Sequence, residues 1–108
     1  MLTLGDVLDL DLEPPEGAEE AGFRHSAVVV TAQWILDAQP TVIDVVPLTT
    51  IRAFTSEIRV RSEDANGLRQ ISAAQSQHVR AGSTRRVEHV RGDVGSTVLT
   101  QIRDPRSA

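Results

Sequence analysis

Hydrophobic and polar residues alternate in the first half of the chain, and this alternation is the pattern of half-buried β-strands. Residues 4–12 place three leucines on one face of a strand and Asp9 and Asp11 on the other. Residues 27–31 form a short run of apolar, mostly β-branched side chains, which is typical of a buried strand. Residues 42–48 are a longer apolar run, and we expect them to form a central strand.

Proline marks the boundaries of these elements. Residues 33–39 contain Trp34 and are expected to form a helical turn that Pro40 closes. Because proline cannot donate a hydrogen bond to a neighbouring strand, Pro47 predicts a bulge or the exit of the third strand. Residues 49–55 are then expected to form a polar connection.

The second half of the chain continues with shorter and more polar strands. Residues 56–61 alternate again, with apolar residues facing in and charged residues facing out, and Asn66-Gly67 is the strongest turn signal nearby. Residues 71–80 are expected to form a further strand, whose small and polar side chains suggest an edge, a barrel wall or a site. Val87 and Val90 are assigned to one more short strand.

The period of the pattern changes from that of a strand to that of a helix near the C-terminus. Asp93 can cap this helix and Pro105 stops it; its apolar positions are Val94, Val98, Leu99 and Ile102. Several short strands followed by one helix indicate a mainly β fold: a small SH3-like barrel of antiparallel strands with a C-terminal helix. The length of 108 residues suits a single domain over residues 1–108.

Cysteine is absent from the sequence, which excludes a disulfide framework, a thiol nucleophile and a cysteine-ligated zinc site. The apolar runs are far too short to span a bilayer, and the N-terminus lacks the pattern of a signal peptide. We therefore expect a cytoplasmic protein with no membrane partner. The three histidines share no metal-ligand spacing, and we predict no metal and no cofactor.

Charge is distributed unevenly along the chain, although its net value is only −4. Residues 1–47 contain nine acidic residues and one arginine, a net charge of −8, whereas residues 48–108 contain ten arginines and six acidic residues, a net charge of +4. The chain contains no lysine, and arginine favours bidentate contacts with phosphate. A chain with separated signs can present a basic face to a polyanion despite its acidic total.

The junction between an acidic loop and the second strand carries two candidate functional residues. Residues 17–22 begin and end with glycine and lack β-branched side chains, as expected of a surface loop. Arg24 and His25 follow this loop, and a cation beside a titratable imidazole makes a plausible site for an anionic ligand. The alternative interpretation is a solvated charge at the strand end beside an ordinary surface histidine.

Motifs along nearly the whole chain resemble, in the same order, those of the MazF/PemK-type toxins of bacterial toxin–antitoxin systems. The loop Gly17-Ala18-Glu19-Glu20-Ala21-Gly22, followed by arginine and a valine-rich strand, is similar to the family's Gly-Ser-Glu-Gln loop, Arg-Pro pair and strand. Val45-Val46-Pro47-Leu48-Thr49-Thr50 resembles a Val-Val-Pro-Leu-Thr-Ser segment. Further similarities are found at Gly5-Asp6-Val7, Asn66-Gly67-Leu68, Gln77-His78-Val79-Arg80 and Ser83-Thr84-Arg85-Arg86-Val87.

The resemblance implies an endoribonuclease, an mRNA interferase that works as a homodimer without metal. Such a toxin cleaves single-stranded RNA at specific sites by 2′-hydroxyl attack on the scissile phosphate, and a MazE-like antitoxin neutralises it by occupying the RNA groove. The family's catalytic arginine and threonine map onto Arg24 and Thr49. Matching the valine strand instead puts His25 at the arginine position, and both assignments stay open.

The same resemblance and the distribution of arginine suggest which residues contact RNA. They are Glu19, Glu20, Thr50, Arg52, Gln77, His78, Arg80, Arg85 and Arg86. His78 could stack on a base or assist proton transfer, or it could be a wall residue of the barrel. His89 is expected to be structural or exposed. We expect the homodimer to bury Trp34 or the Ala53-Phe54 region.

Two other functions stay open on the same fold. The chain could be a protein-binding toxin that resembles the gyrase poisons, which would need no chemistry at Arg24 or Thr49. It could also be a degenerate family member that binds RNA or antitoxin without cutting. Metal-independent cleavage of single-stranded RNA would distinguish the ribonuclease from both.

Overall fold

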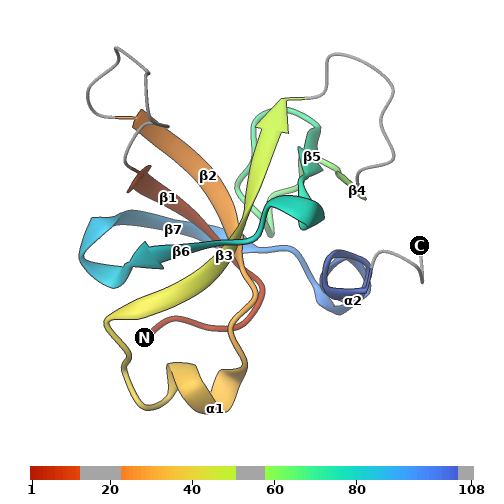
Figure 1. Cartoon of the computed structure of the whole chain (residues 1–108). Coiled ribbons are helices and arrows are strands. Elements are labelled where there is room, and N and C mark those ends of the chain that lie inside the picture. The colour runs from red at the N-terminus through yellow and green to blue at the C-terminus, as the bar shows by residue number, and fades with distance from the viewer. Residues whose placement is uncertain (13–22, 51–57, 105–108) are drawn as a thin grey trace.

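The computed structural model describes residues 1–12, 23–50 and 58–104. Within them the chain forms β1 (Asp6–Leu12), β2 (Phe23–Val29), α1 (Gln33–Leu36), β3 (Val42–Thr50), β4 (Ile58–Val60), β5 (Ser72–Ala74), the 3-10 turn η1 (Ser76–His78), β6 (Arg80–Ser83), the 3-10 turn η2 (Thr84–Arg86), β7 (Val87–Asp93) and α2 (Ser96–Arg103) (Figure 1). The strands pair antiparallel in the order β4-β5-β3-β2-β1-β7, and β6 also pairs with β3. The predicted mainly β fold with a terminal helix is confirmed.

Apolar residues on both faces of the β1–β2–β3 sheet are buried, and they form two clusters. The first cluster includes residues of β4 and α2; its members are Val7, Val28, Val46, Leu48, Ile58, Val60, Ala74, Val94 and Ile102. The second cluster includes α1; its members are Leu8, Leu10, Ala27, Val29, Leu36, Ile43 and Val45. Neighbours such as Val7 and Leu8 belong to different clusters because successive side chains of a strand point to opposite faces.

The central strand β3 changes partner along one edge. Its first half pairs with β6 as far as Val45–Arg80, and its last residues pair with β5 from Leu48–Ala74 onward. Two residues of β3 lie between these pairings, whereas the opposite chain has five, three of which form η1. The Pro47 carbonyl accepts a hydrogen bond from the Gln75 N–H at 3.0 Å on this edge. Since Pro47 has no N–H to donate there, a regular ladder cannot continue past it.

Two predictions about this region are therefore wrong. The strand does not exit at Pro47 but continues to Thr50, so Thr49 and Thr50 belong to β3 and not to a polar connection. Residues 71–80 are not one strand, because the missing donor of Pro47 separates β5 from β6 and the intervening chain turns into η1.

β2 and β3 pair over only part of their lengths. Three residue pairs join them, and the last is Ala27 with Pro47. Beyond it, within the described part of the chain, residues 23–26 of β2 pair only with β1, and residues 48–50 of β3 pair only with β5. Figure 1 shows the two strands diverging from this point toward the top of the view. We call the opening between residues 23–26 and residues 48–50 the fork.

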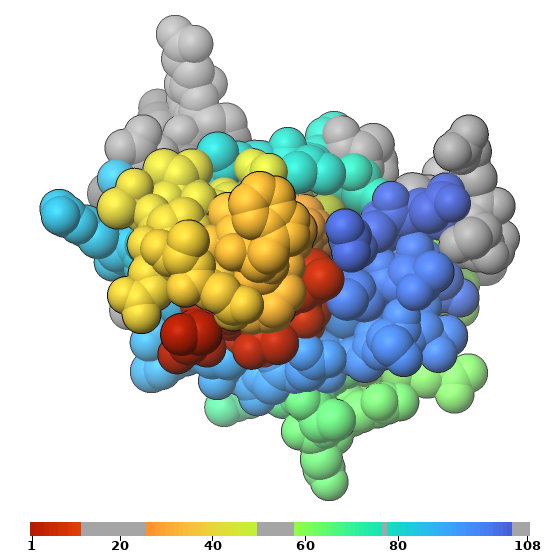
Figure 2. Space-filling view, turned by 90° about the horizontal axis from the view of Figure 1, so that it is seen from below, coloured from red at the N-terminus to blue at the C-terminus, as the bar shows by residue number. Residues whose placement is uncertain are grey.

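Away from the fork, the N-terminal residues and α1 cover the barrel, and we call this region the closed end. Figure 2, viewed from below, shows the two segments side by side. The Leu4 N–H donates to Oε1 of Gln33 in α1 at 2.9 Å. Leu36 is buried, whereas Trp34 on the same helix is 75% exposed. The predicted helical turn over residues 33–39 is confirmed, although the helix itself ends at Leu36.

The C-terminal helix begins later than predicted. Its N-cap is Gly95, and Asp93 is the last residue of β7. The Asp93 carboxylate accepts a hydrogen bond from the Gly95 N–H at 2.7 Å, so it holds the turn before the helix and does not cap it. Ile102 of α2 is buried in the first cluster. The helix ends at Arg103, and Pro105 lies outside the described residues.

Candidate functional site

Arg24 and His25 lie inside β2 and not at the junction of a loop and a strand, which corrects the prediction. Both pair with β1, where Arg24 stands opposite Asp11 and His25 opposite Leu10. This pairing extends the strand four residues before the apolar run at Ala27. Because successive residues of a strand belong to opposite faces, Arg24 and His25 occupy different sides of the sheet.

Thr49 lies across the fork from these residues and is half-buried. Ala27 and Pro47 are the last pair that joins β2 to β3. His25 comes two residues before Ala27, and Thr49 comes two residues after Pro47. In antiparallel strands these two positions share a face, and they are the first on that face past the last pair. The register therefore associates His25 with Thr49, and it assigns Arg24 to the other face.

A polar hollow of about 260 Å³ adjoins the fork. Its lining residues are Ser26, Leu68, Arg69, Gln70, Ser72 and Arg91. Ser26 follows His25 in β2, and Ser72 pairs with Thr50 at the end of β3. The hollow thus lies next to both strands that form the fork, and we call it the fork hollow.

Asp9 of β1 organises one wall of the fork hollow. Nε of Arg91 lies 2.8 Å from both Asp9 carboxylate oxygens, and Oγ of Ser26 donates to Oδ1 of Asp9 at 3.1 Å. Arg91 also donates from Nη1 to the Gly67 carbonyl at 3.2 Å. Burial alone would raise the pKa of Asp9, but the hydrogen bonds from Arg91 and Ser26 hold this pKa below its ordinary value. Asp9 therefore stays ionised at neutral pH and fixes both side chains.

The segment that follows residues 66–67 forms another wall of the fork hollow. The turn predicted at Asn66-Gly67 is confirmed. Asn66 is buried, and its side chain accepts from the Leu68 N–H at 3.0 Å and donates to the Arg61 carbonyl at 2.7 Å. Gly67 has a φ of +69°, and a Cβ there would lie 2.6 Å from the Arg91 carbonyl oxygen. Glycine is required at this position because the turn passes so close to β7.

Arg59, which was not among the predicted RNA contacts, is connected to Thr49 by a row of paired positions across the sheet. Thr49 pairs with Ala73 of β5, and Ala73 pairs with Arg59 of β4. Arg59 is exposed and belongs to the same face as Thr49, two strands away. The alternation of residues 56–61 predicted only that Arg59 faces outward. The strand that pairs with β4 cannot be predicted from the neighbouring residues alone.

Three of the predicted RNA-contacting residues follow one edge of β3. Gln77 and His78 belong to η1, and Arg80 opens β6 opposite Val45. His78 is exposed and Arg80 is half-buried. Thr50, another predicted contact, is at the end of β3 inside the fork.

The remaining predicted contacts are divided between η2 and the part of the chain that is not described. Arg85 and Arg86 belong to η2, and Nη1 of Arg86 donates to the Asp11 carbonyl at 3.4 Å. Asp11 is also the partner of Arg24, so the two arginines are associated with the same residue of β1. Predictions at Glu19, Glu20, Arg52 and Ala53-Phe54 fall outside the described residues.

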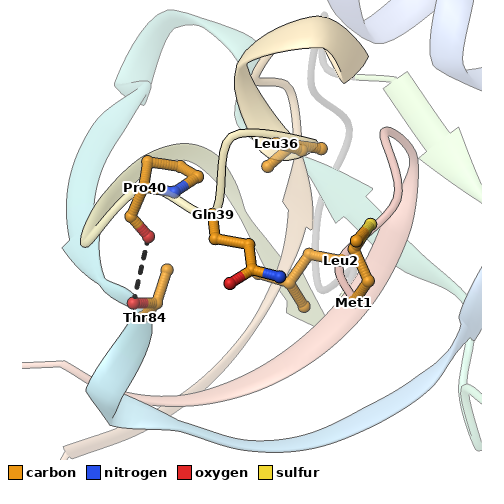
Figure 3. A pocket seen from close by; sticks show the side chains of 6 residues that line it. All are labelled: Met1, Leu2, Leu36, Gln39, Pro40 and Thr84. Atoms are coloured by element: carbon orange, nitrogen blue, oxygen red, sulfur yellow. Dashed lines mark hydrogen bonds between the residues drawn. The ribbon is translucent and has the colours of Figure 1, made fainter.

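A second hollow, of about 290 Å³, lies at the closed end. Figure 3 shows its lining residues, which are Met1, Leu2, Leu36, Gln39, Pro40 and Thr84. None of them has an acidic or basic side chain, and the Thr84 hydroxyl donates to the Pro40 carbonyl at 3.3 Å. This lining offers a phosphate group no side-chain charge.

The fork hollow was missed at the level of sequence. Its cations are Arg69, which follows a turn, and Arg91, which lies within β7, and no motif connects the two. The contact between Asp9 and Arg91 joins residues 82 positions apart. Within the described residues, no three His, Cys, Asp or Glu side chains gather so that they could hold a metal ion. No helix found there has the length and hydropathy needed to cross a membrane.

Three solved structures illustrate the fold that this chain shares. A MazE–MazF complex from Deinococcus radiodurans (Form II) is 20% identical with a TM-score of 0.70, over 94% of this chain and 88% of that one. The Mycobacterium tuberculosis toxin MazF-mt6 is 16% identical with a TM-score of 0.67, over 90% and 87%. An endoribonuclease in complex with its cognate antitoxin, from a mycobacterial species, is 16% identical with a TM-score of 0.66, over 94% and 87%. These matches confirm the predicted SH3-like barrel.

Comparison at the level of sequence defines the family. No curated protein sequence matches the chain. Residues 3–104, however, match the profile of the PemK-like, MazF-like toxins of type II toxin–antitoxin systems. This match covers nearly the whole chain and confirms the resemblance that the ordered motifs indicated. The chain therefore belongs to the PemK-like, MazF-like toxins of type II toxin–antitoxin systems, a family of endoribonucleases.

Proposed function

We propose that the fork is the catalytic centre at which this toxin cuts single-stranded RNA, without metal and at short specific sequences. The observation that carries the proposal is the register that associates His25 with Thr49 just past the last pair of β2 and β3. Among the residues that the structure describes, residues 23–26 and 48–50 have no strand partner on the side that faces the fork. Their backbone N–H and C=O groups can therefore bind the sugar-phosphate chain, as backbone groups commonly do.

The reaction requires a proton acceptor for the ribose 2′-hydroxyl, donors to the phosphorane oxygens and a proton for the leaving 5′-oxygen. A neutral imidazole at His25 can take the 2′-hydroxyl proton, the usual role of histidine as a general base. The Thr49 hydroxyl can donate to a non-bridging oxygen. The 2′-oxygen then bonds to phosphorus as the P–O5′ bond breaks, and the leaving 5′-oxygen takes a proton from water. The products are a cyclic phosphate and a 5′-hydroxyl.

Arg24 has a separate role in this proposal, as a phosphate-binding residue. Arg24 of β2 pairs with Asp11 of β1, and Arg86 of η2 donates to the carbonyl of the same Asp11. Two arginines associated with the same part of β1 suit the charge of an RNA backbone. The register thus favours His25 as the equivalent of the family's catalytic arginine, and Arg24 becomes part of the binding surface.

The partners of the toxin follow from its family. A MazE-like antitoxin segment that occupies the fork would exclude RNA and so neutralise the toxin. The active form is a homodimer, and Trp34 is a candidate for its interface because it is 75% exposed. Light scattering at micromolar concentration should show the dimer, and a protein that stays monomeric there would contradict this assignment.

Cleavage of a mixed RNA in excess chelator tests the proposal. Discrete fragments with 5′-hydroxyl ends are expected. His25→Ala should lower the single-turnover rate roughly 10²–10⁴-fold, the usual contribution of a general base or acid, and should remove a titration near neutral pH. Arg24→Ala should mainly weaken RNA binding.

The other outcomes identify the alternatives. If Arg24→Ala causes the turnover loss and His25→Ala does not, Arg24 is the catalytic equivalent and the register argument fails. If neither variant changes turnover, catalysis lies elsewhere and the segment before β2 is a partner-binding element. If the wild type produces no discrete fragments over a wide concentration range, only the RNA-binding and protein-binding toxins remain.

A further inference from the structure

The fork hollow has more hydrogen-bond capacity than the protein itself uses. The side chains of Arg69 and Gln70 are exposed, and neither bonds to any described residue. Arg91 uses Nε for Asp9 and one bond from Nη1 for the Gly67 carbonyl, which leaves donors on its guanidinium. The hollow therefore presents unused donors on three side chains around one space.

Toward a ligand, the two hydroxyl groups of the hollow can act only as acceptors, because their hydrogens are already used within the protein. The Ser26 hydroxyl donates to Asp9 at 3.1 Å, and the Ser72 hydroxyl donates to the Gln70 carbonyl at 3.2 Å. Because each hydroxyl has a single hydrogen, both oxygens have only lone pairs to offer a ligand. Two guanidinium groups thus offer a ligand donors alone, the Gln70 amide offers a donor and an acceptor, and the two hydroxyl oxygens offer acceptors, so donors outnumber acceptors in the site.

The size and position of the hollow suit one nucleobase. Its volume of about 260 Å³ is below the roughly 300–1,000 Å³ that enclose drug-sized ligands. Ser26 comes two residues after Arg24 in β2, so the two positions share a face of the sheet, and Ser72 pairs with Thr50 of the same fork. A nucleotide whose phosphate is bound by Arg24 would therefore have its base within reach of the hollow. Leu68 and the plane of a guanidinium supply surfaces on which a base can stack.

We propose that the fork hollow is a base-recognition site that prefers a base with carbonyl oxygens, uracil or guanine, over cytosine or adenine. The proposal rests on the fork as the RNA site. Carbonyl oxygens accept from the donors of Arg69, Arg91 and Gln70, and the imino N–H of these bases donates to a serine oxygen. An amino group in the same place would set donors against donors, and the unpaired donors would cost affinity. Arginine paired with guanine carbonyl and ring nitrogen is the commonest specific contact of this kind.

Binding of two short RNAs that cannot be cut tests the proposal independently of catalysis. The probes are octamers of uridine and of cytidine with 2′-fluoro groups, which lack the attacking hydroxyl and differ chiefly in one carbonyl against one amino group. The wild type should bind the uridine octamer about tenfold or more tightly, the usual discrimination from one good base contact. Arg69→Gln should reduce this ratio. Gln70→Glu should reduce it further or reverse it, because a carboxylate accepts from the cytosine amino group. Arg103→Gln on the exposed side of α2 is the matched control and should leave the ratio unchanged.

Three results would overturn the inference, and they separate it from the proposed function. A wild type that cuts mixed RNA but binds both octamers equally has no base site in the hollow. An Arg69→Gln variant that weakens both octamers equally and lowers the salt dependence shows a phosphate site and not a base site. A wild type that binds neither octamer and cuts nothing removes the RNA assignment as a whole. A clear preference for uridine without cleavage supports the hollow and contradicts only the catalytic part.

Discussion

Two hollows of similar size lie in different regions of the molecule, and their linings differ in chemistry. The hollow at the closed end, of about 290 Å³, is lined mainly by apolar side chains such as Leu2, Leu36 and Pro40. The fork hollow, of about 260 Å³, is lined by two arginines, two serines and a glutamine around a single leucine. Volume does not distinguish these sites, but the donors and charges that face each space do.

Strand pairing explains the difference. At the closed end, backbone groups bond within the chain: the Gly5 N–H donates to the Val29 carbonyl at 2.9 Å, and the Leu36 N–H donates to the Ala32 carbonyl at 3.1 Å. The space beside it can therefore be filled by apolar groups. At the fork, β2 and β3 have separated, and each keeps one partner strand among the described residues. Polar side chains and unpaired strand edges can lie there because they stay in reach of solvent or a polar ligand.

The largest expected effect concerns stability at the closed end. Leu36→Ala should lower the free energy of unfolding by about 2–5 kcal/mol, because Leu36 is 2% exposed and its removal leaves a cavity in the second cluster. Urea unfolding measures the change. Ala38→Ser, at an exposed position just after the same helix, is the control and should stay within about 0.5 kcal/mol. The turnover of folded Leu36→Ala protein should match the wild type, and a large loss would mean that the two regions are coupled.

Substitution of one threonine at the fork and one at the closed end compares the two regions in their effect on turnover. Thr49→Val should lower single-turnover cleavage by roughly 10²–10³-fold, the usual cost of removing one donor to a developing oxyanion. Thr84→Val removes a hydroxyl at the closed end that is bonded to the Pro40 carbonyl, and it should leave turnover unchanged. Equal losses in both variants would show that Thr49 acts through the fold and not on the phosphate.

Salt dependence of RNA binding should respond to the arginines of η2. Replacing Arg85 and Arg86 together by glutamine should lower the slope of log affinity against log salt by up to about two units, because two phosphate contacts are lost. Filter binding over a range of salt concentrations measures this slope. Arg103→Gln on α2 should leave it nearly unchanged, and a slope that also survives the double substitution would remove η2 from the RNA surface.

The smallest expected effects appear in acid titrations of stability, where Asp6 and Asp9 should act with opposite sign. Burial raises the pKa of Asp6, aided by the nearby Asp93, although a hydrogen bond from the Thr3 N–H opposes the shift. Asp6 therefore contributes most below its ordinary pKa of 3.8, and this contribution is lost as pH rises through its raised value. Asp9, with a lowered pKa, stabilises above 3.8 and loses this contribution as pH falls through its folded value.

Two variants separate these contributions. Asp9→Asn should lower stability at neutral pH and converge with the wild type in strong acid. Asp6→Asn should instead remove the loss of stability that accompanies the rise from pH 3.8 toward neutrality, because the amide cannot ionise. Urea midpoints measured across this pH range test both, and an Asp9→Asn curve parallel to that of the wild type would contradict the ion pair with Arg91.

Some features of the fold were predictable because they depend only on neighbouring residues. The alternation around Asp9 already implied a strand with leucines on one face, and Ile58 and Val60 are buried on either side of exposed Arg59 as expected. The turn at Asn66-Gly67 was predictable for the same reason, since glycine permits its positive φ. The order of the motifs also indicated the family that the profile match confirmed.

The sequence by itself determined the strands, the turn, the separation of charge along the chain and the set of candidate residues, because periodicity and residue type are local properties. Only the tertiary structure decided which of these candidates meet. The exchange of β6 for β5 beside Pro47 and the pairing of Ala27 with Pro47 are choices of register between distant segments. The bond between Asp9 and Arg91 likewise spans 82 positions. Register depends on how all the strands bury their apolar faces together, and no short stretch of residues contains that information.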